Sequence, residues 1–314
     1  MPDLTNSGIG RPPAVSVPAR RAPAGPATGE NLPAALRLLP AEPRRHLVAL
    51  HRYVRHVDQL GGIDLGWTDP GGRPAAPAAR VAALDAFEAQ LLDLFAVIER
   101  GALDPRRLDG LPPALAGLAG TVARCRLPVE PLRRLIEANR RDQLPVRYPS
   151  WDRLLEYCHL SADPVGELVL HVFGAATAER IELSDCICTA LRIVQHLQDV
   201  PDDHRRGRVY LPAEDLARFG VCDNELAARH ASGPLRCVLR LHAGRAEALL
   251  DAGAPLLTEL RGWARAAVAG YLAGGRAALA ALHRSGYDPM SGPPRPRRTG
   301  IAGRWVRAMV VTPR

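Results

Sequence analysis

The 314-residue sequence contains no lysine, so all 41 of its strongly basic side chains are arginines. We attribute this absence to a GC-rich genome rather than to a recognition code. Aromatic residues are also scarce, at 4% of the chain, whereas alanine, leucine and arginine dominate. Because strands favour β-branched and aromatic residues and helices favour Ala, Leu and Arg, this composition predicts helices rather than sheets.

The six cysteines include no CxxC pair. Cys186 and Cys188 are two residues apart and would lie on different sides of a helix, which argues against a zinc site. We therefore expect reduced thiols and a cytoplasmic location. The sequence also lacks a signal peptide and an apolar run of about 18 residues, so any membrane contact is expected to be peripheral at most.

The formal net charge of +8 is unevenly distributed, because arginines gather near both ends of the chain. These end segments are rich in proline and glycine and lack interleaved aromatic residues, so we expect no nucleic-acid binding. We predict a disordered leader at 1–29, a single all-α catalytic domain at 30–294 and a basic tail at 295–314.

Helical periodicity extends through the predicted domain. A proline suits the first turn of a helix, so the first helix is expected after Pro40 or Pro43, up to about residue 60. Glycines and prolines between 61 and 74 predict a loop, and the chain after Tyr287 is expected to be a loop or tail. Further helices are expected at about 81–100, 113–125, 129–142, 150–160, 163–174, 184–200, 223–231, 234–250 and 256–284.

The segment 195–212, QHLQDVPDDHRRGRVYLP, carries the strongest functional signal. Asp199 and Asp203 are four residues apart, so on a helix they share a face and can converge on one hard cation. The arginines that follow, Arg208 among them, suit phosphate oxygens. The pattern predicts a Mg²⁺–diphosphate site. The alternative is a solvated helix end of mixed charge, and Pro201 predicts a kink or a helix end inside the motif.

Two of the predicted helices carry a polar stripe beside apolar positions, with spacings of three and four residues that keep each stripe on one face. If both helices are buried, the two stripes line one cavity. The alternative is a pair of amphipathic surface helices. The stripes consist of His51, Arg55, Asp58 and Gly62 in the first helix, and of Arg192, Gln195, Asp199 and Asp203 in the second.

Several segments resemble the squalene/phytoene synthase family, and most closely its bacterial hydroxysqualene synthases. They span roughly residues 30–294 in the expected order. The resemblance implies one all-α isoprenoid-synthase domain around a central cavity, where two facing aspartate-rich motifs bind Mg²⁺ and prenyl diphosphates. The matching segments are ENLPAALRLLP, LHRYVRHVD, DQLPVRYPSWDRLLEYC, SADPVG, SDCICTALRIVQHLQDV, RRGRVYLPAEDLARFGV, AGGRAAL and YDPMSGPP.

The resemblance also implies roles for individual side chains. Asp199, Asp203 and Asp58 would hold Mg²⁺ and act in catalysis. His51 is the candidate base, or the residue that orients an acceptor. The remaining matched residues would contact the diphosphate; they are Arg55, Arg192, Gln195, Arg208 and Tyr210.

The first aspartate-rich motif departs from the family pattern. Where the family has DDxxD, this chain has DQLGG, which keeps Asp58 but has Gln59 and Gly62 in place of the other carboxylates. Asp64 comes two residues too late to share the face of Asp58. A wall with one carboxylate favours binding one diphosphate at a time, which predicts a C5 to C15 prenyl donor and an aromatic acceptor.

Squalene-synthase-like enzymes that prenylate aromatic rings such as carbazoles fit that pattern. Two alternatives remain open. The first is condensation of two farnesyl diphosphates to hydroxysqualene or presqualene diphosphate. The second is an inactive paralogue that serves as a partner subunit of an active synthase.

Overall fold

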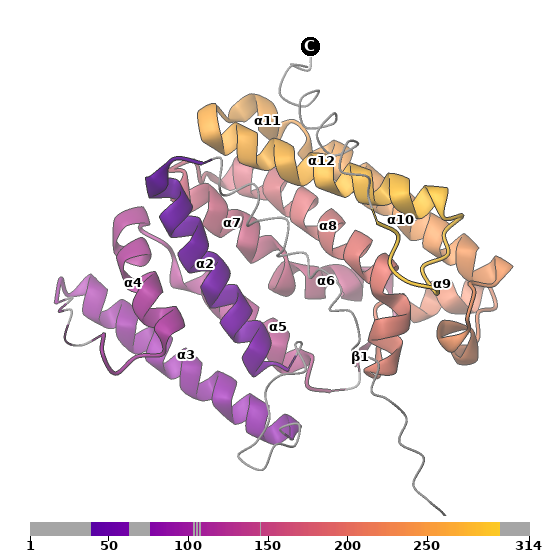
Figure 1. The fold of residues 1–314 in the computed structure, drawn as a ribbon, viewed down its shortest axis with the longest axis horizontal. Helices are drawn as coiled ribbons and strands as arrows, with labels where there is room; N and C mark the ends of the chain where they lie inside the picture. Colours follow the sequence, from indigo (N-terminus) through magenta and orange to yellow (C-terminus); the bar gives the residue numbers. More distant parts are fainter. Residues whose placement is uncertain are drawn as a thin grey trace, which may run out of the picture.

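The computed structural model describes residues 39–62 and 76–295, except 103, 105, 107 and 145. The described chain is almost entirely helical, which confirms the predicted all-α class (Figure 1). In this view α2, α3 and α4 lie on the left, α11 and α12 along the top and α9 and α10 on the right, with α5 to α8 in the middle. The helices are α2 (Ala41–Leu60), α3 (Pro77–Glu99), α4 (Pro113–Cys125), α5 (Val129–Arg141), α6 (Trp151–Ser161), α7 (Asp163–Val172), α8 (Ala178–Arg205), α9 (Ala213–Arg218), α10 (Gly233–Gly253), α11 (Leu256–Glu259) and α12 (Gly262–Arg284).

Two short strands join the ends of two helices. β1 (Val146–Arg147) follows α5, and β2 (Arg208–Val209) follows α8. They pair in parallel, with Val146 opposite Arg208 and Arg147 opposite Val209. The pairing therefore holds the C-terminal end of α8, which carries the DxxxD motif, close to the C-terminal end of α5.

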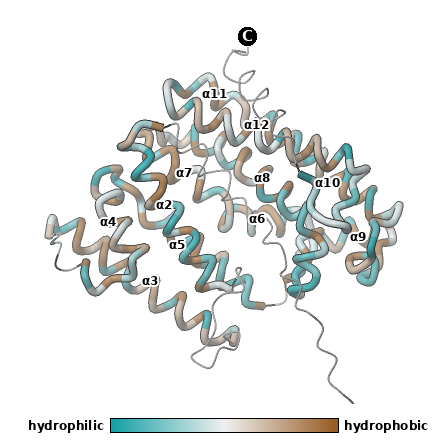
Figure 2. The backbone as a smooth tube through the Cα atoms, in the orientation of Figure 1, coloured by the Kyte–Doolittle hydropathy of each residue, from teal (hydrophilic) through white to brown (hydrophobic). Residues whose placement is uncertain are grey.

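Buried side chains form two hydrophobic clusters. One is built mainly by α2, α3, α4 and α5, and the other mainly by α6, α8, α10 and α12. Helix α7 joins them, because Leu168 and Val169 belong to the first cluster and Leu170 to the second. Figure 2 shows hydrophobic and hydrophilic residues alternating along these helices, as expected for helices with one buried face.

Glycines allow α8 to lie against both of its main neighbours. A Cβ on Gly253 of α10 would be 2.5 Å from Ile187 Cγ1 and 2.7 Å from the Leu183 carbonyl oxygen. A Cβ on Gly166 of α7 would be 2.2 Å from Ser184 Oγ. Side chains at these two glycines would push the helices apart, so both contacts require the absence of a Cβ.

The observed elements differ from the predicted ones in four places. Helix α8 runs from Ala178 to Arg205, past Pro201, instead of ending near 200. The predicted 256–284 helix is two helices: α11 ends at Glu259, and α12 begins at Gly262, which has a φ of +56°. The 223–231 helix is a short 3-10 turn at Asp223–Ala227, and α9 was not predicted.

Some predictions concern residues that the structure does not describe. The undescribed residues include the predicted leader at 1–29, most of the predicted tail at 295–314, and Asp64. Among the described helices, none combines the length and the apolar character needed to span a bilayer.

Candidate active site

Asp199 and Asp203 lie one turn apart on α8, and both are half-buried. Burial, followed by the neighbouring carboxylates of Asp203 and Asp202, raises the pKa of Asp199 to about 6. The nearby Arg206 and a hydrogen bond from Gln195 only partly oppose this rise. The motif thus concentrates negative charge in a partly desolvated place, where a divalent cation would relieve the repulsion.

Arg192 and Gln195 extend the same face of α8 toward its N-terminus. Arg192 donates to the Ser161 carbonyl oxygen at 2.7 Å and to Gln195 Oε1 at 3.2 Å. Burial lowers the pKa of Arg192, but the nearby Tyr157 and Asp58 outweigh burial and leave it raised. The influence of Asp58 on Arg192 shows that α2 approaches this part of α8.

The α2 stripe contributes His51, Arg55 and Asp58, all half-buried. Asp58 accepts a hydrogen bond of 3.4 Å from Asn139 Nδ2 on α5. Burial, and then the charge of Arg55, lower the pKa of His51 below its ordinary value. His51 is therefore neutral near pH 7 and able to accept a proton, as the predicted base must.

The other two positions of the first motif, Gln59 and Gly62, carry no carboxylate. Gln59 is exposed, and Gly62 follows the end of α2 with a φ of +72°. A Cβ on Gly62 would lie 2.5 Å from the guanidinium carbon of Arg80 on α3. Gln143 donates to the Gly61 carbonyl oxygen at 2.8 Å and fixes this turn. A guanidinium thus occupies the place beside Gly62, and Asp58 is the only carboxylate in the second half of α2.

Arg208 and Tyr210 lie behind the DxxxD motif, on and after β2. Both are buried and bonded to Asp142, which follows α5: Arg208 Nη2 donates to the Asp142 carbonyl oxygen at 2.9 Å, and the Tyr210 hydroxyl donates to Asp142 Oδ1 at 3.0 Å. Tyr157 donates to Asp142 Oδ2 at 2.8 Å. Their predicted contact with diphosphate stays a prediction, since these bonds direct both side chains toward Asp142.

Sequence reasoning did not identify Asp142 as part of the site. It is only 5% exposed, and burial raises its pKa while Arg208 and the two tyrosines oppose the rise. The available signal was weak: Asp142 lies in the matched segment DQLPVRYPSWDRLLEYC, but nothing in the spacing relates it to Tyr210.

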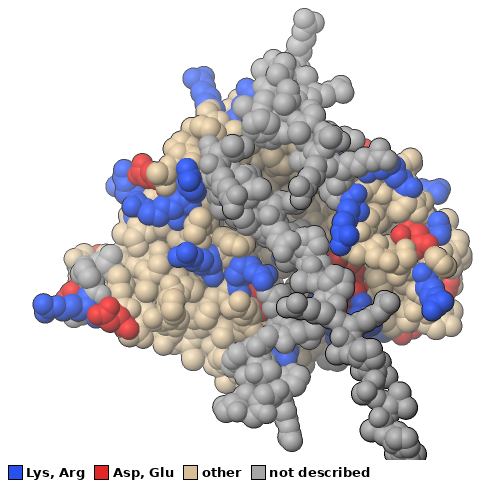
Figure 3. All heavy atoms as spheres, in the orientation of Figure 1, with Lys and Arg blue, Asp and Glu red and all other residues tan. Residues whose placement is uncertain are grey.

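Basic side chains surround the outer face of α2 (Figure 3). Arg44, Arg45 and Arg52 are all exposed on this helix. Such a concentration of positive charge raises the local concentration of anions at this surface.

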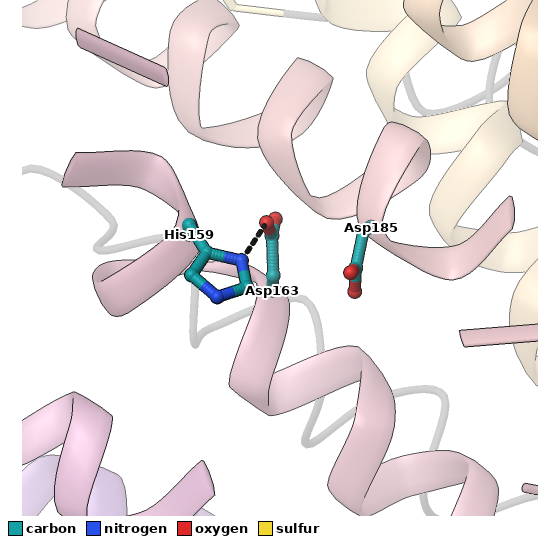
Figure 4. A group of neighbouring side chains, drawn as sticks. All are labelled: His159, Asp163 and Asp185. Atoms are coloured by element: carbon teal, nitrogen blue, oxygen red, sulfur yellow. Dashed lines mark ion pairs between the residues drawn. The ribbon is translucent and has the colours of Figure 1, made fainter. Parts of the chain in front are cut away.

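A second group of potential metal ligands lies on α6, α7 and α8. It consists of His159, Asp163 and Asp185, whose ligand atoms lie within 4.8 Å of one another (Figure 4). Arg134 Nη1, which can only donate, is 3.2 Å from His159 Nε2, so His159 Nδ1 carries the proton and directs it to Asp163 Oδ2 at 3.5 Å. Burial, and then Asp185, raise the pKa of Asp163 to about 7. The contacts are those of a hydrogen-bonded group in which two of the three potential ligands offer the oxygen atoms that Mg²⁺ prefers.

The α8 carboxylates also fit Mg²⁺. Carboxylate oxygens are the ligands that Mg²⁺ prefers, and it commonly takes one or two of them together with phosphate oxygens. Burial, and then the charges of Asp203 and Asp202, raise the pKa of Asp199 in spite of the nearby Arg206, and a bound cation would favour the ionised form.

Comparisons with known proteins agree with this geometry. The family model of squalene/phytoene synthases matches residues 26–302. The chain is 32% identical over 238 residues to the hydroxysqualene synthase of Sinorhizobium fredii, covering 74% of this chain and 72% of that protein. It is 33% identical over 229 residues to phytoene synthase 1 of Arabidopsis thaliana, covering 71% of this chain and 49% of that protein.

The chain is also similar to solved structures of squalene and dehydrosqualene synthases. A squalene synthase from Alicyclobacillus acidocaldarius superposes with a TM-score of 0.70 at 39% identity, over 84% of this chain and 90% of that one. A ligand-bound dehydrosqualene synthase, at 20% identity, shares the fold with a TM-score of 0.75 over 90% of this chain and 91% of that one. With its two aspartate-bearing helices and a family match over most of its length, this chain belongs to the squalene/phytoene synthase family of prenyl-transferring enzymes.

Proposed function

We propose that the protein is a Mg²⁺-dependent synthase of the hydroxysqualene type, which condenses two farnesyl diphosphates and captures the final carbocation with water. This reverses the order of the two enzymatic hypotheses drawn from the sequence. The similar proteins are named hydroxysqualene and phytoene synthases, and their names give no support to an aromatic acceptor.

The observation that supports the proposal is the pair of carboxylates on α8, Asp199 and Asp203, which are one turn apart and partly buried. Arg192 interacts electrostatically with Asp58 and also bonds Gln195 on the face of α8 that carries the two aspartates. These carboxylates and the partly buried guanidinium of Arg192 would together suit a metal–diphosphate.

The side chains have separate tasks in this reaction. Asp199 and Asp203, with Asp58, would hold Mg²⁺, whose charge offsets the negative charge that grows on the leaving diphosphate. Arg192 and Arg55 would bind oxygens that the metal does not reach. The carbon–oxygen bond of the prenyl diphosphate breaks, and its electron pair leaves with the diphosphate.

The remaining steps need no reductant. The allylic cation joins a double bond of the second farnesyl chain, and loss of a proton gives a neutral C30 diphosphate. Its carbon–oxygen bond then breaks, the electron pair leaves with the second diphosphate, and water adds to the resulting C30 cation and loses a proton. His51, which is neutral near pH 7, is placed on the α2 stripe to accept such a proton.

Incubation of the protein with farnesyl diphosphate and Mg²⁺ alone tests the proposal, with products identified by mass spectrometry. A C30 alcohol or a C30 diphosphate is the expected product, and its loss in Asp199→Asn and Asp203→Asn would assign it to this site. If the protein makes no C30 product under these conditions, the proposal is wrong.

A second candidate rests on the altered first wall. Because Asp58 is the only carboxylate in the second half of α2 and Arg80 lies beside Gly62, this wall would suit one metal–diphosphate at a time. Transfer of a C5 to C15 prenyl group to a neutral aromatic acceptor would use such a site. Consumption of dimethylallyl or geranyl diphosphate only when an aromatic acceptor is present would support this candidate, and an inactive partner subunit would show neither reaction.

A further inference from the structure

His196 lies on α8 beside the DxxxD motif and has no role in the reaction described above. Its ring is 7% exposed, and its Nδ1 lies 3.5 Å from Asp203 Oδ2. Its Nε2 is buried, with no hydrogen-bond partner in the structure. A carboxylate can only accept, so Nδ1 carries the proton and Nε2 holds a lone pair. His196 therefore acts as a neutral donor to Asp203.

One face of the His196 ring packs against another aromatic ring. It stacks on Tyr210, with ring centroids 3.7 Å apart and an interplanar angle of 15°. Tyr210 is itself fixed by its hydrogen bond to Asp142, which also binds Tyr157. The orientation of the Nδ1–H bond is thus set by a buried network anchored on the chain after α5.

The contact between His196 and Asp203 spans the position in α8 where Pro201 removes a backbone hydrogen bond. Pro201 has no N–H, so the carbonyl of Leu197 lacks its helical hydrogen bond. His196 precedes this gap and Asp203 follows it. Because residues seven apart lie on the same helical face, the side-chain bond links the two sides of the gap.

We propose that His196 is the positioning residue of Asp203, whose carboxylate it aligns for metal–diphosphate binding across the Pro201 interruption. The inference rests on the proposed function, because it assumes that Asp203 binds the metal. Hydrogen bonds from outside the coordination sphere orient metal-binding carboxylates, and their loss commonly weakens metal affinity about 10- to 100-fold.

Two substitutions separate the hydrogen bond from the stacking. His196→Phe keeps an aromatic ring on Tyr210 but removes the donor. His196→Asn loses the ring but places an amide N–H near the position of Nδ1. Binding of Mn²⁺ with inorganic pyrophosphate, measured by calorimetry on the full-length protein, reports the site without requiring turnover.

His242→Phe is the matched control. His242 is also buried, on α10, where its ring is 5.2 Å from that of Trp151 and its Nε2 is 3.1 Å from Asp215 Oδ2. It therefore has the same kind of surroundings outside the site. Its replacement is expected to lower the thermal midpoint without changing Mn²⁺–pyrophosphate affinity.

We expect His196→Phe to weaken Mn²⁺–pyrophosphate binding about 10- to 100-fold while His196→Asn stays within a few-fold of wild type. Wild-type affinity in His196→Phe, or an equal loss in both variants, would overturn the positioning role. Should the phenylalanine variant fail to fold, His196→Asn decides alone, since lost affinity there overturns the role and retained affinity supports it.

Measuring Asp203→Ala separates a failure of the positioning role of His196 from a failure of the proposed function. If Asp203→Ala abolishes binding while His196→Phe does not affect it, only the positioning role fails. If Asp203→Ala binds Mn²⁺–pyrophosphate like wild type, the metal site proposed on α8 fails together with the role of His196.

Discussion

Replacing Asp199 with asparagine should make the protein more stable while removing its function. The pKa of Asp199 is raised from 3.8 to about 6, first by burial and then by Asp203 and Asp202. A carboxyl group with a raised pKa binds its proton more tightly in the folded state than in the unfolded state. The ionised form therefore destabilises the fold, and stability is lost as the pH rises from about 4 through 6.

The magnitude follows from the two pKa values. The difference between 3.8 and about 6 corresponds to about 3 kcal/mol at pH 7.5, an upper value because salt and solvent screen a half-buried charge. The substituted asparagine side chain would have the same shape, stay neutral at every pH and keep a hydrogen bond with Gln195. The gain should shrink as the pH falls below 6 and approach zero below pH 3.8, where the wild-type carboxyl is protonated in both states.

Urea unfolding of wild type and Asp199→Asn, at several pH values from 4 to 8 without divalent cations, measures this effect. Mg²⁺ with pyrophosphate should then stabilise the wild type but not the variant, because ligands stabilise only the state that binds them. Equal or lower stability of Asp199→Asn at pH 7.5, or a difference that does not change with pH, would refute the reasoning.

Three further predictions concern the two walls and the network behind them. Asp203→Asn should reduce turnover at least about 100-fold, as the loss of one oriented electrostatic group commonly does, measured as diphosphate release. Gly62→Asp should not improve Mg²⁺ affinity by calorimetry, since the new carboxylate would meet Arg80; improved affinity would show that the first wall can be rebuilt. Arg208→Leu should lower the free energy of unfolding by about 1–3 kcal/mol, because it leaves the buried Asp142 carbonyl oxygen without its donor, whereas the exposed Arg206→Leu should change it little.

The sequence predicted the helical class and most helix positions because amphipathic periodicity is a local property. It failed at α8, since Pro201 indicates a helix end from local chemistry alone. Contacts made beyond the proline are not local in sequence: His196 contacts Asp203, and β2, which follows α8, pairs with β1. The break before α12 was missed for the opposite reason, because Gly262 lies in an otherwise continuous apolar pattern.

The candidate site was predictable where a single helix carries it. Asp199 and Asp203 follow from their spacing, and Asp58 from the matched first motif. Asp142 and His196 were not predicted, because their partners come from other elements or from the far side of a proline. Tyr210 was expected to face the diphosphate, but only the three-dimensional structure shows its hydroxyl bonded to Asp142.

Because the interior is divided into two hydrophobic clusters, we expect the two regions of the protein to unfold locally and independently of each other. Leu168 and Val169 of α7 pack in one cluster, and the next residue, Leu170, packs in the other. A ligand that touches both Asp58 and Asp199 adds a bond between regions that α5 and α7 otherwise connect, and it favours only conformations in which both regions are intact. Hydrogen exchange of backbone amides should therefore report different opening free energies for α2 and α10 in the free protein. In the complex it should report one larger opening free energy for both helices.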